Sequence, residues 1–136
     1  MIKVSKKVLI ITDGKKSIRS IALAISQSLS GYKIKIIPSK RFCTTMLLPV
    51  DTFFIGCERH SPKSFSYIEK MLSHINLASR KCGIFSVNEK AAQYLAKILN
   101  TCDAAVSPPF LAEKNDNETV IDNANLKKWL KNITEN

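Results

Sequence analysis

A chain of 136 residues predicts a single domain, residues 1–136, large enough to bury about two-thirds of its unfolded surface. Its composition is that of a globular protein, and it has no apolar run long enough for a membrane span or a signal-peptide core, so we expect a cytoplasmic protein. The net charge of +10 is concentrated in residues 1–50, which hold ten Lys and Arg against the single acid Asp13; this favours an anionic partner, with a surface tuned only for solubility as the alternative.

Apolar runs separated by turns predict five strands, at residues 8–11, 33–37, 52–55, 83–87 and 104–106. Apolar residues at helical spacing follow the first, third and fourth strands, and a closing helix is expected at residues 126–133. The predicted N-caps are Ser17, Ser61 and Asn88. The segment 38–50 is the least regular part and has room for a short helix at most.

Strands and helices that alternate in this way form βαβ units, and hence a parallel sheet with helices on both faces. We expect an α/β fold, a three-layer doubly wound sandwich whose five strands take the order 2-1-3-4-5. Such folds bind ligands at the carboxyl ends of strands 1 and 3. This places the turn at residues 12–17 and the loops at 56–61 and 87–88 around one crevice.

The turn TDGKKS, residues 12–17, joins the first strand to the first helix, where many α/β proteins bind a phosphate. It fails the Walker A pattern, because the first glycine would fall at Leu9, and it lacks the three glycines of a dinucleotide fingerprint. A helix start still offers N–H donors, and the lysines add positive charge, so the sequence predicts an anion site. A simple helix start with solvated lysines, whose turn Asp13 caps, is the alternative.

The same turn resembles that of flavodoxins, which begin with a strand, the segment [ST]-x-T-G-x-[ST] and a helix. Thr12 and Ser17 keep the hydroxyls at both ends of that frame, although its centre differs. DTFFIGCERHSPKSFSYIEKML resembles the third flavodoxin strand with its helix, and RKCGIFSV resembles the fourth strand. AAVSPPFLAEKN and ANLKKWLKNI resemble the last strand, loop and terminal helix. The resemblance covers nearly the whole chain in layout and implies a flavodoxin-like fold.

The resemblance also implies FMN as a noncovalent cofactor. Its phosphate would be bound by the residues of the opening turn, Thr12, Asp13, Gly14, Lys15, Lys16 and Ser17. Its ring would be lined by Cys57, Glu58, Arg59, His60, Val87 and Asn88. His60 stands where flavodoxins usually place an aromatic ring, and the loop after the fourth strand is short, so much of the usual stacking is missing. Flavodoxins also tend to be acidic, whereas this chain is basic.

Two hypotheses follow. In the first, the protein is an electron carrier that uses FMN and an acidic redox partner. In the second, it is a flavodoxin-like module that has lost the flavin and binds an acidic protein or other anionic partner through residues 1–50. Nucleic-acid binding is a weaker option, since the basic residues are not interleaved with stacking aromatics. No nucleophile elbow or metal-ligand spacing supports an independent catalyst or a metal, and the four cysteines are expected to be reduced thiols.

Overall fold

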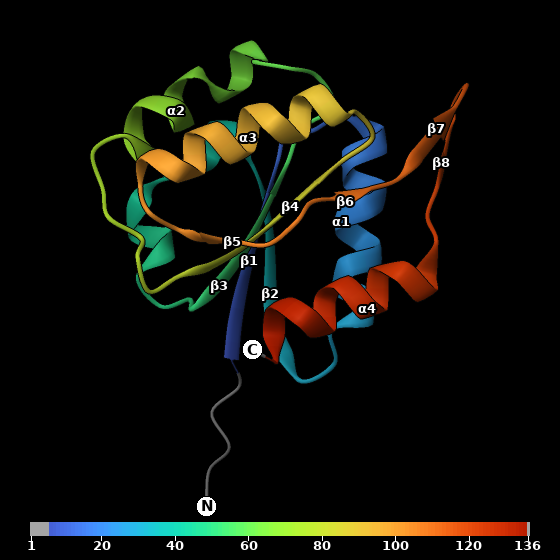
Figure 1. Cartoon of the computed structure of the whole chain (residues 1–136), viewed down its shortest axis with the longest axis horizontal. Coiled ribbons are helices and arrows are strands. Elements are labelled where there is room, and N and C mark those ends of the chain that lie inside the picture. Colours follow the sequence, from blue (N-terminus) through green and yellow to red (C-terminus); the bar gives the residue numbers. More distant parts are fainter. Residues whose placement is uncertain (1–5, 136) are drawn as a thin grey trace, which may run out of the picture.

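The computed structural model describes residues 6–135, and a parallel sheet forms its centre (Figure 1). The main strands take the order β2-β1-β3-β4-β5, with bounds β1 (Lys6–Thr12), β2 (Tyr32–Pro38), β3 (Thr52–Gly56), β4 (Lys81–Ser86) and β5 (Ala105–Val106). A further short strand, β6 (Phe110–Leu111), also pairs with β4, beyond the end of β5. The predicted strand order and the doubly wound α/β fold are therefore confirmed.

Helices cover both faces of this sheet. Their bounds are α1 (Lys16–Ser28), α2 (Ser66–Leu72), α3 (Glu89–Thr101) and α4 (Asn123–Thr134). Figure 1 shows α2 and α3 together on one side of the sheet and α1 and α4 on the other. Each face has its own hydrophobic cluster, because successive side chains of a strand point to opposite faces. In the described chain, no helix is both long enough and apolar enough to cross a membrane.

The central strand β3 shows why the core has two halves. All five of its residues are buried; Phe53 and Ile55 pack under α2 and α3, while Phe54 packs against the α1 and α4 side. On that second side, the ring of Trp129 lies 5.4 Å from the ring of Phe54. Its indole N–H donates to the carbonyl of Pro108 over 2.8 Å, so Trp129 packs against the core and also binds the loop between β5 and β6.

Two predicted N-caps are wrong. Ser17 is not the N-cap of α1, since the helix begins at Lys16 and Lys15 is the N-cap, without a side-chain hydrogen bond. Ser61 does not cap α2 either: it has a φ of 50°, and a 3-10 turn, η3 (Lys63–Phe65), precedes the helix. The third prediction is confirmed, because Asn88 caps α3 by accepting a hydrogen bond from the backbone N–H of Lys90 over 2.8 Å.

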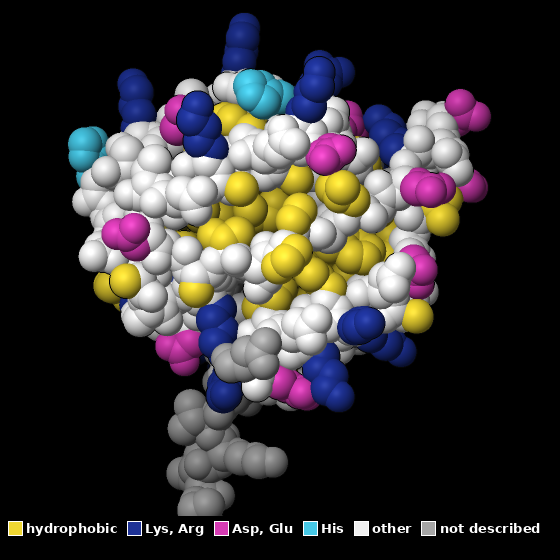
Figure 2. All heavy atoms as spheres, viewed as in Figure 1, with side chains coloured by type: hydrophobic (Ala, Val, Ile, Leu, Met, Phe, Trp, Pro, Cys, Tyr) yellow, Lys and Arg dark blue, Asp and Glu magenta, His cyan; other side chains and the backbone are white. Residues whose placement is uncertain are grey.

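Two further segments complete the fold. The irregular stretch after β2 contains the short 3-10 turns η1 (Ser39–Arg41) and η2 (Thr44–Leu47), within the limit of a short helix at most that the sequence predicts. The loop expected before the last helix instead contains an antiparallel hairpin, β7 (Glu113–Asn115) with β8 (Glu118–Val120). The hairpin stands away from the body of the molecule in Figure 1. Figure 2, seen from the same side, shows hydrophobic side chains gathered between α3 and α4, where the short β5 and β6 lie.

Candidate functional site

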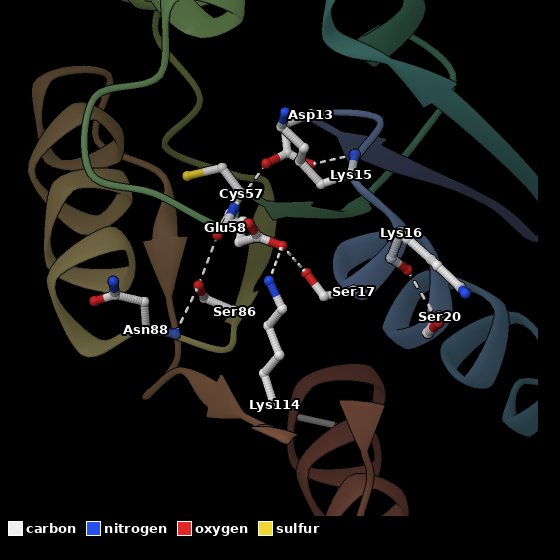
Figure 3. Close-up of polar contacts among 10 residues, drawn as sticks. All are labelled: Asp13, Lys15, Lys16, Ser17, Ser20, Cys57, Glu58, Ser86, Asn88 and Lys114. Atoms are coloured by element: carbon white, nitrogen blue, oxygen red, sulfur yellow. Dashed lines mark hydrogen bonds and ion pairs between the residues drawn. The ribbon is translucent and has the colours of Figure 1, made fainter. Parts of the chain in front are cut away.

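Three loops meet at the carboxyl ends of β1, β3 and β4, as the strand order predicts (Figure 3). Asp13 ties the first of them to the second. One of its carboxylate oxygens accepts from the backbone N–H of Lys15 over 2.9 Å, and the other accepts from the backbone N–H of Glu58 over 2.7 Å. Burial raises the pKa of the Asp13 carboxyl, although the two N–H donors oppose this rise. Asp13 therefore fixes the backbone of both loops, a broader role than the cap of its own turn.

A second contact joins the same two loops through side chains. The Ser17 hydroxyl, in the first turn of α1, donates to the Oε2 atom of Glu58. The ammonium group of Lys114, on β7, lies 3.2 Å from the same oxygen. The Ser17 hydrogen bond lowers the pKa of the Glu58 carboxyl, and Lys114 and Arg59 lower it further. A negatively charged oxygen thus rests at the positive end of α1, held in place by a hydroxyl and a lysine.

The start of α1 itself has no internal cap among the described residues. Its N-cap Lys15 makes no side-chain hydrogen bond, and its first turn holds no acidic residue. By contrast, α3 has Asn88 as a cap and Glu89 in its first turn, and α4 is capped by Asp122. Lys15 and Lys16 are exposed beside the first turn of α1. This end of α1 therefore keeps N–H donors and positive charge available to an anionic oxygen.

Gly14 shapes the turn that leads into α1. Its φ of 81° lies in the left-handed region that favours glycine, and a Cβ built on it would have no atom within 4 Å. The Gly14 N–H donates to the buried hydroxyl of Thr12 over 3.2 Å. Thr12 and Gly14 also border a cavity of about 450 Å³ whose other lining residues include Arg19. In this turn Gly14 is therefore exposed to solvent, whereas the Thr12 side chain is buried.

The third loop is fixed by Ser86, which is fully buried at the end of β4. Its hydroxyl donates to the carbonyl of Cys57 over 2.6 Å and accepts from the backbone N–H of Asn88 over 3.1 Å. Asn88 uses its side-chain oxygen to cap α3, and Val87 is half-buried between them. The loop after β4 is therefore a short, tightly bonded link.

The loop after β3 presents fewer side chains to the crevice than the sequence predicted. The Cys57 thiol is buried in the core under α2 and α3, and burial raises its pKa to about 12, with the Asp13 carboxylate adding to the rise. The ring of His60 lies 5.4 Å from the ring of Tyr94, on α3, so it is packed toward that helix. Tyr94 in turn donates its hydroxyl to Glu69 over 3.1 Å, and burial raises the Tyr94 pKa. Arg59 is exposed.

The structure thus brings together the opening turn and Glu58, as the sequence predicted for one crevice. It adds Lys114 and Ser86, which sequence reasoning missed because neither belongs to a recognisable motif. All four cysteines are free thiols. Within residues 6–135, no group of three or more His, Cys, Asp or Glu side chains is placed to hold a metal ion.

Comparison with known proteins gives a clear answer for the fold alone. No family model matches the chain, and no curated protein matches it in sequence. Among solved structures, it is similar to oxidised flavodoxin 2 from Bacillus cereus, with a TM-score of 0.79 and 19% identity over 95% of this chain and 98% of that one. It is also similar to a short-chain flavodoxin associated with a non-canonical PDU bacterial microcompartment, with a TM-score of 0.78 and 11% identity over 98% of both chains.

A flavodoxin from Streptococcus pneumoniae TIGR4 gives a TM-score of 0.76 at 12% identity, covering 95% of this chain and 97% of that one. At such low identity these likenesses establish the architecture and nothing finer. The chain therefore has the flavodoxin-like fold.

Proposed function

We propose that this protein binds FMN noncovalently at the carboxyl end of its sheet and carries electrons to a redox partner. The observation that carries the proposal is the start of α1. There the Ser17 hydroxyl, in a first turn without a side-chain cap, already binds a carboxylate oxygen, that of Glu58, and Lys15 and Lys16 are exposed at the same helix end. The likeness to solved flavodoxins over at least 95% of the chain supports the choice of ligand.

The donor set at this position fits a phosphate group. The N–H groups of the first turn of α1 and the hydroxyl of Ser17 would bind phosphate oxygens, and Lys15 and Lys16 would balance the charge. Glu58 would have to leave Ser17, because a carboxylate and a phosphate repel each other at close range. Lys114, released from Glu58, would then be free to face the phosphate.

The ring end of the site would rest on backbone more than on side chains. Asp13 accepts from the backbone N–H of Glu58, and Ser86 bonds the Cys57 carbonyl and the Asn88 N–H, so this backbone would give the ring a fixed edge. His60 is the one aromatic side chain of residues 57–60, and it is packed on Tyr94 of α3. When bound, FMN would supply the redox chemistry; the surrounding positive charge of Arg59 and the lysines would favour its anionic reduced form.

The basic character of the chain also sets the expected partner. Flavodoxin-type carriers meet their partners through complementary surface charge, and a chain of net charge +10 would match an acidic partner. Association with such a partner should weaken as salt concentration rises.

A flavin titration tests the proposal. Purified protein, freed of any flavin by mild denaturation and refolding, is titrated with FMN while flavin fluorescence is recorded. We expect saturable quenching by FMN and markedly weaker quenching by riboflavin, which lacks the phosphate. Protein that quenches neither compound would overturn the proposal, and equal affinity for both would overturn the phosphate position at α1.

A further inference from the structure

The outer strand β2 leaves one edge of the sheet open. In the described chain it pairs only with β1, in unbroken parallel register from Lys6 opposite Tyr32 to Thr12 opposite Pro38. Four of its seven residues are exposed, and within residues 6–135 no second strand pairs with this edge. An exposed, regular edge presents a row of free N–H and C=O groups that can pair with another strand.

One face of this edge is basic. Lys33 and Lys35 are exposed on the side of the sheet that α2 and α3 cover, and Lys33 lies directly opposite Lys7 of β1. Within residues 6–135, none of the three lysines has an acidic partner. Together with Met46 and Val50 they line a cavity of about 410 Å³. Three uncompensated lysines around one cavity repel each other, and an acidic group would relieve that repulsion.

The other face of the same edge is apolar. Ile34 and Ile36 point to the side of the sheet that α1 and α4 cover, and Ile36 is 37% exposed. Leu23, on α1, is 52% exposed and lines a cavity of about 450 Å³ together with Ile36 and Pro38. Lysines on an edge strand commonly prevent unwanted pairing with other strands. This role does not explain why an isoleucine and a leucine are exposed beside the lysines.

We propose that β2 is a docking edge for an extended, acidic segment of another protein, which adds to the sheet as a further strand. Main-chain hydrogen bonds to β2 would hold the segment, and its side chains would alternate between the two faces. Acidic residues would face Lys33 and Lys35, and apolar residues between them would cover Ile34, Ile36 and Leu23. The segment recognised is therefore one in which acidic and apolar residues alternate.

The positive charge of β2 favours an acidic segment of another protein over the β2 strand of a second copy of this chain. Two β2 strands brought edge to edge would place lysines against lysines, which is unfavourable across a strand pair. The basic face of the docking edge lies apart from the proposed flavin site, since no loop residue around Glu58 lines the cavity beside Lys33 and Lys35. The apolar face lies closer to that site, because Thr12 and Gly14 of the opening turn line the same cavity of about 450 Å³ as Leu23 and Ile36. The peptide assay described below contains no flavin, so a failure to bind the peptide is distinct from a failure to bind FMN.

Two peptides of identical composition test the proposal. The probe is a fluorescein-labelled peptide of eight residues in which glutamate and valine alternate, and the comparison peptide has four glutamates followed by four valines. Binding to the full chain is measured by fluorescence anisotropy at low salt. We expect saturable binding of the alternating peptide and clearly weaker binding of the block peptide, because only the first can match both faces of β2.

Two charge-reversal variants locate the binding. K33E/K35E should weaken binding of the alternating peptide by at least about tenfold, since two attractive cross-strand pairs become repulsive. K90E/K97E, which reverses two exposed lysines on α3, makes the same change in net charge and should alter binding far less. Leu23→Glu should weaken binding through the apolar face, and circular dichroism confirms that each variant is folded.

Three results would overturn the proposal. These are no saturable binding of the alternating peptide, equal binding of the block peptide, and equal losses in K33E/K35E and K90E/K97E. The first would show that the edge binds no such strand. The second and third would show that the chain attracts acidic peptides by net charge alone.

Discussion

Replacing Glu58 by glutamine should change stability and ligand binding in opposite directions. The carboxylate of Glu58 accepts the Ser17 hydrogen bond and forms an ion pair with Lys114. The amide introduced by E58Q would keep a neutral hydrogen bond to Ser17 and lose the ion pair. A hydrogen bond to a charged group contributes about 1.5–3 kcal/mol against about 0.5–1.5 kcal/mol for a neutral one, and an exposed ion pair contributes about 0.2–1 kcal/mol. We therefore expect E58Q to lower the free energy of unfolding by about 1–2 kcal/mol.

The same substitution should strengthen FMN binding. In the wild-type chain the phosphate has to displace a carboxylate from Ser17, whereas in E58Q it displaces a neutral amide. We expect the dissociation constant for FMN to fall about tenfold, which corresponds to about 1.4 kcal/mol. The affinity for riboflavin should change far less, because riboflavin has no phosphate group that must displace Glu58 from Ser17. Flavin fluorescence quenching measures both constants.

The stability difference between wild type and E58Q should also depend on pH. The folded-state pKa of Glu58 lies below its ordinary value of 4.5, so its ionised form stabilises the fold above that pH. This contribution is lost as the pH falls through the lowered pKa, where wild-type Glu58 becomes neutral like glutamine. Urea unfolding followed by circular dichroism should thus show a clear difference at pH 7 that shrinks steadily below pH 4.5.

E113Q is the matched control, because Glu113 is exposed on the same hairpin as Lys114 and the substitution removes the same charge. We expect it to leave stability and FMN affinity close to those of the wild type. If E58Q binds FMN no more tightly than E113Q, Glu58 does not compete with the phosphate. If the two variants unfold at the same urea concentration, the Ser17 and Lys114 contacts do not stabilise the fold.

Two further predictions concern the backbone that carries the site. Gly56→Ala should lower the free energy of unfolding by about 1–3 kcal/mol, because its Cβ would lie 2.5 Å from the Phe85 ring, and an unchanged urea midpoint would contradict this packing. Ser86→Ala should lower the free energy of unfolding by about 1–3 kcal/mol, since the Cys57 carbonyl and the Asn88 N–H lose their hydrogen-bond partner. Amide hydrogen exchange at Asn88 should become faster, and unchanged exchange there would contradict the role of Ser86 in joining the two loops.

The strands of the sheet could be predicted from the sequence, because strands with buried side chains appear in it as recognisable apolar runs. The run Thr52–Gly56 is buried on both faces, and such a run is readable as a central strand without any tertiary information. Asn88 was likewise readable as a cap, because its hydrogen bond partner is only two residues away. Features whose causes lie within a few residues could therefore be predicted.

Features that depend on residues far away in the sequence could not be predicted. Ser17 looks like an N-cap, but its hydroxyl is directed to Glu58, which lies 41 residues further along the chain. Ser61 precedes a proline in the pattern of a helix start, but the chain inserts a 3-10 turn that buries Phe65 before α2 begins. The β7–β8 hairpin has no buried face, so apolar alternation could not reveal it. Its two-residue turn begins at Asp116, with a φ of 52°, and the pair Asp-Asn there was the only local signal.

The position of Asp13 explains why the basic half of the chain acts as an uncompensated charge. It is the single acidic residue among residues 1–50, and of the basic residues there, Lys3 lies outside the described part. Its carboxylate faces inward, where it binds two backbone N–H groups and its pKa is raised by burial. At the start of α1 the Asp13 carboxylate attracts Lys15, and the Glu58 carboxylate supplies a second negative charge. The lysines on β2 have no acidic partner within residues 6–135, so a ligand or another chain would have to neutralise their charge.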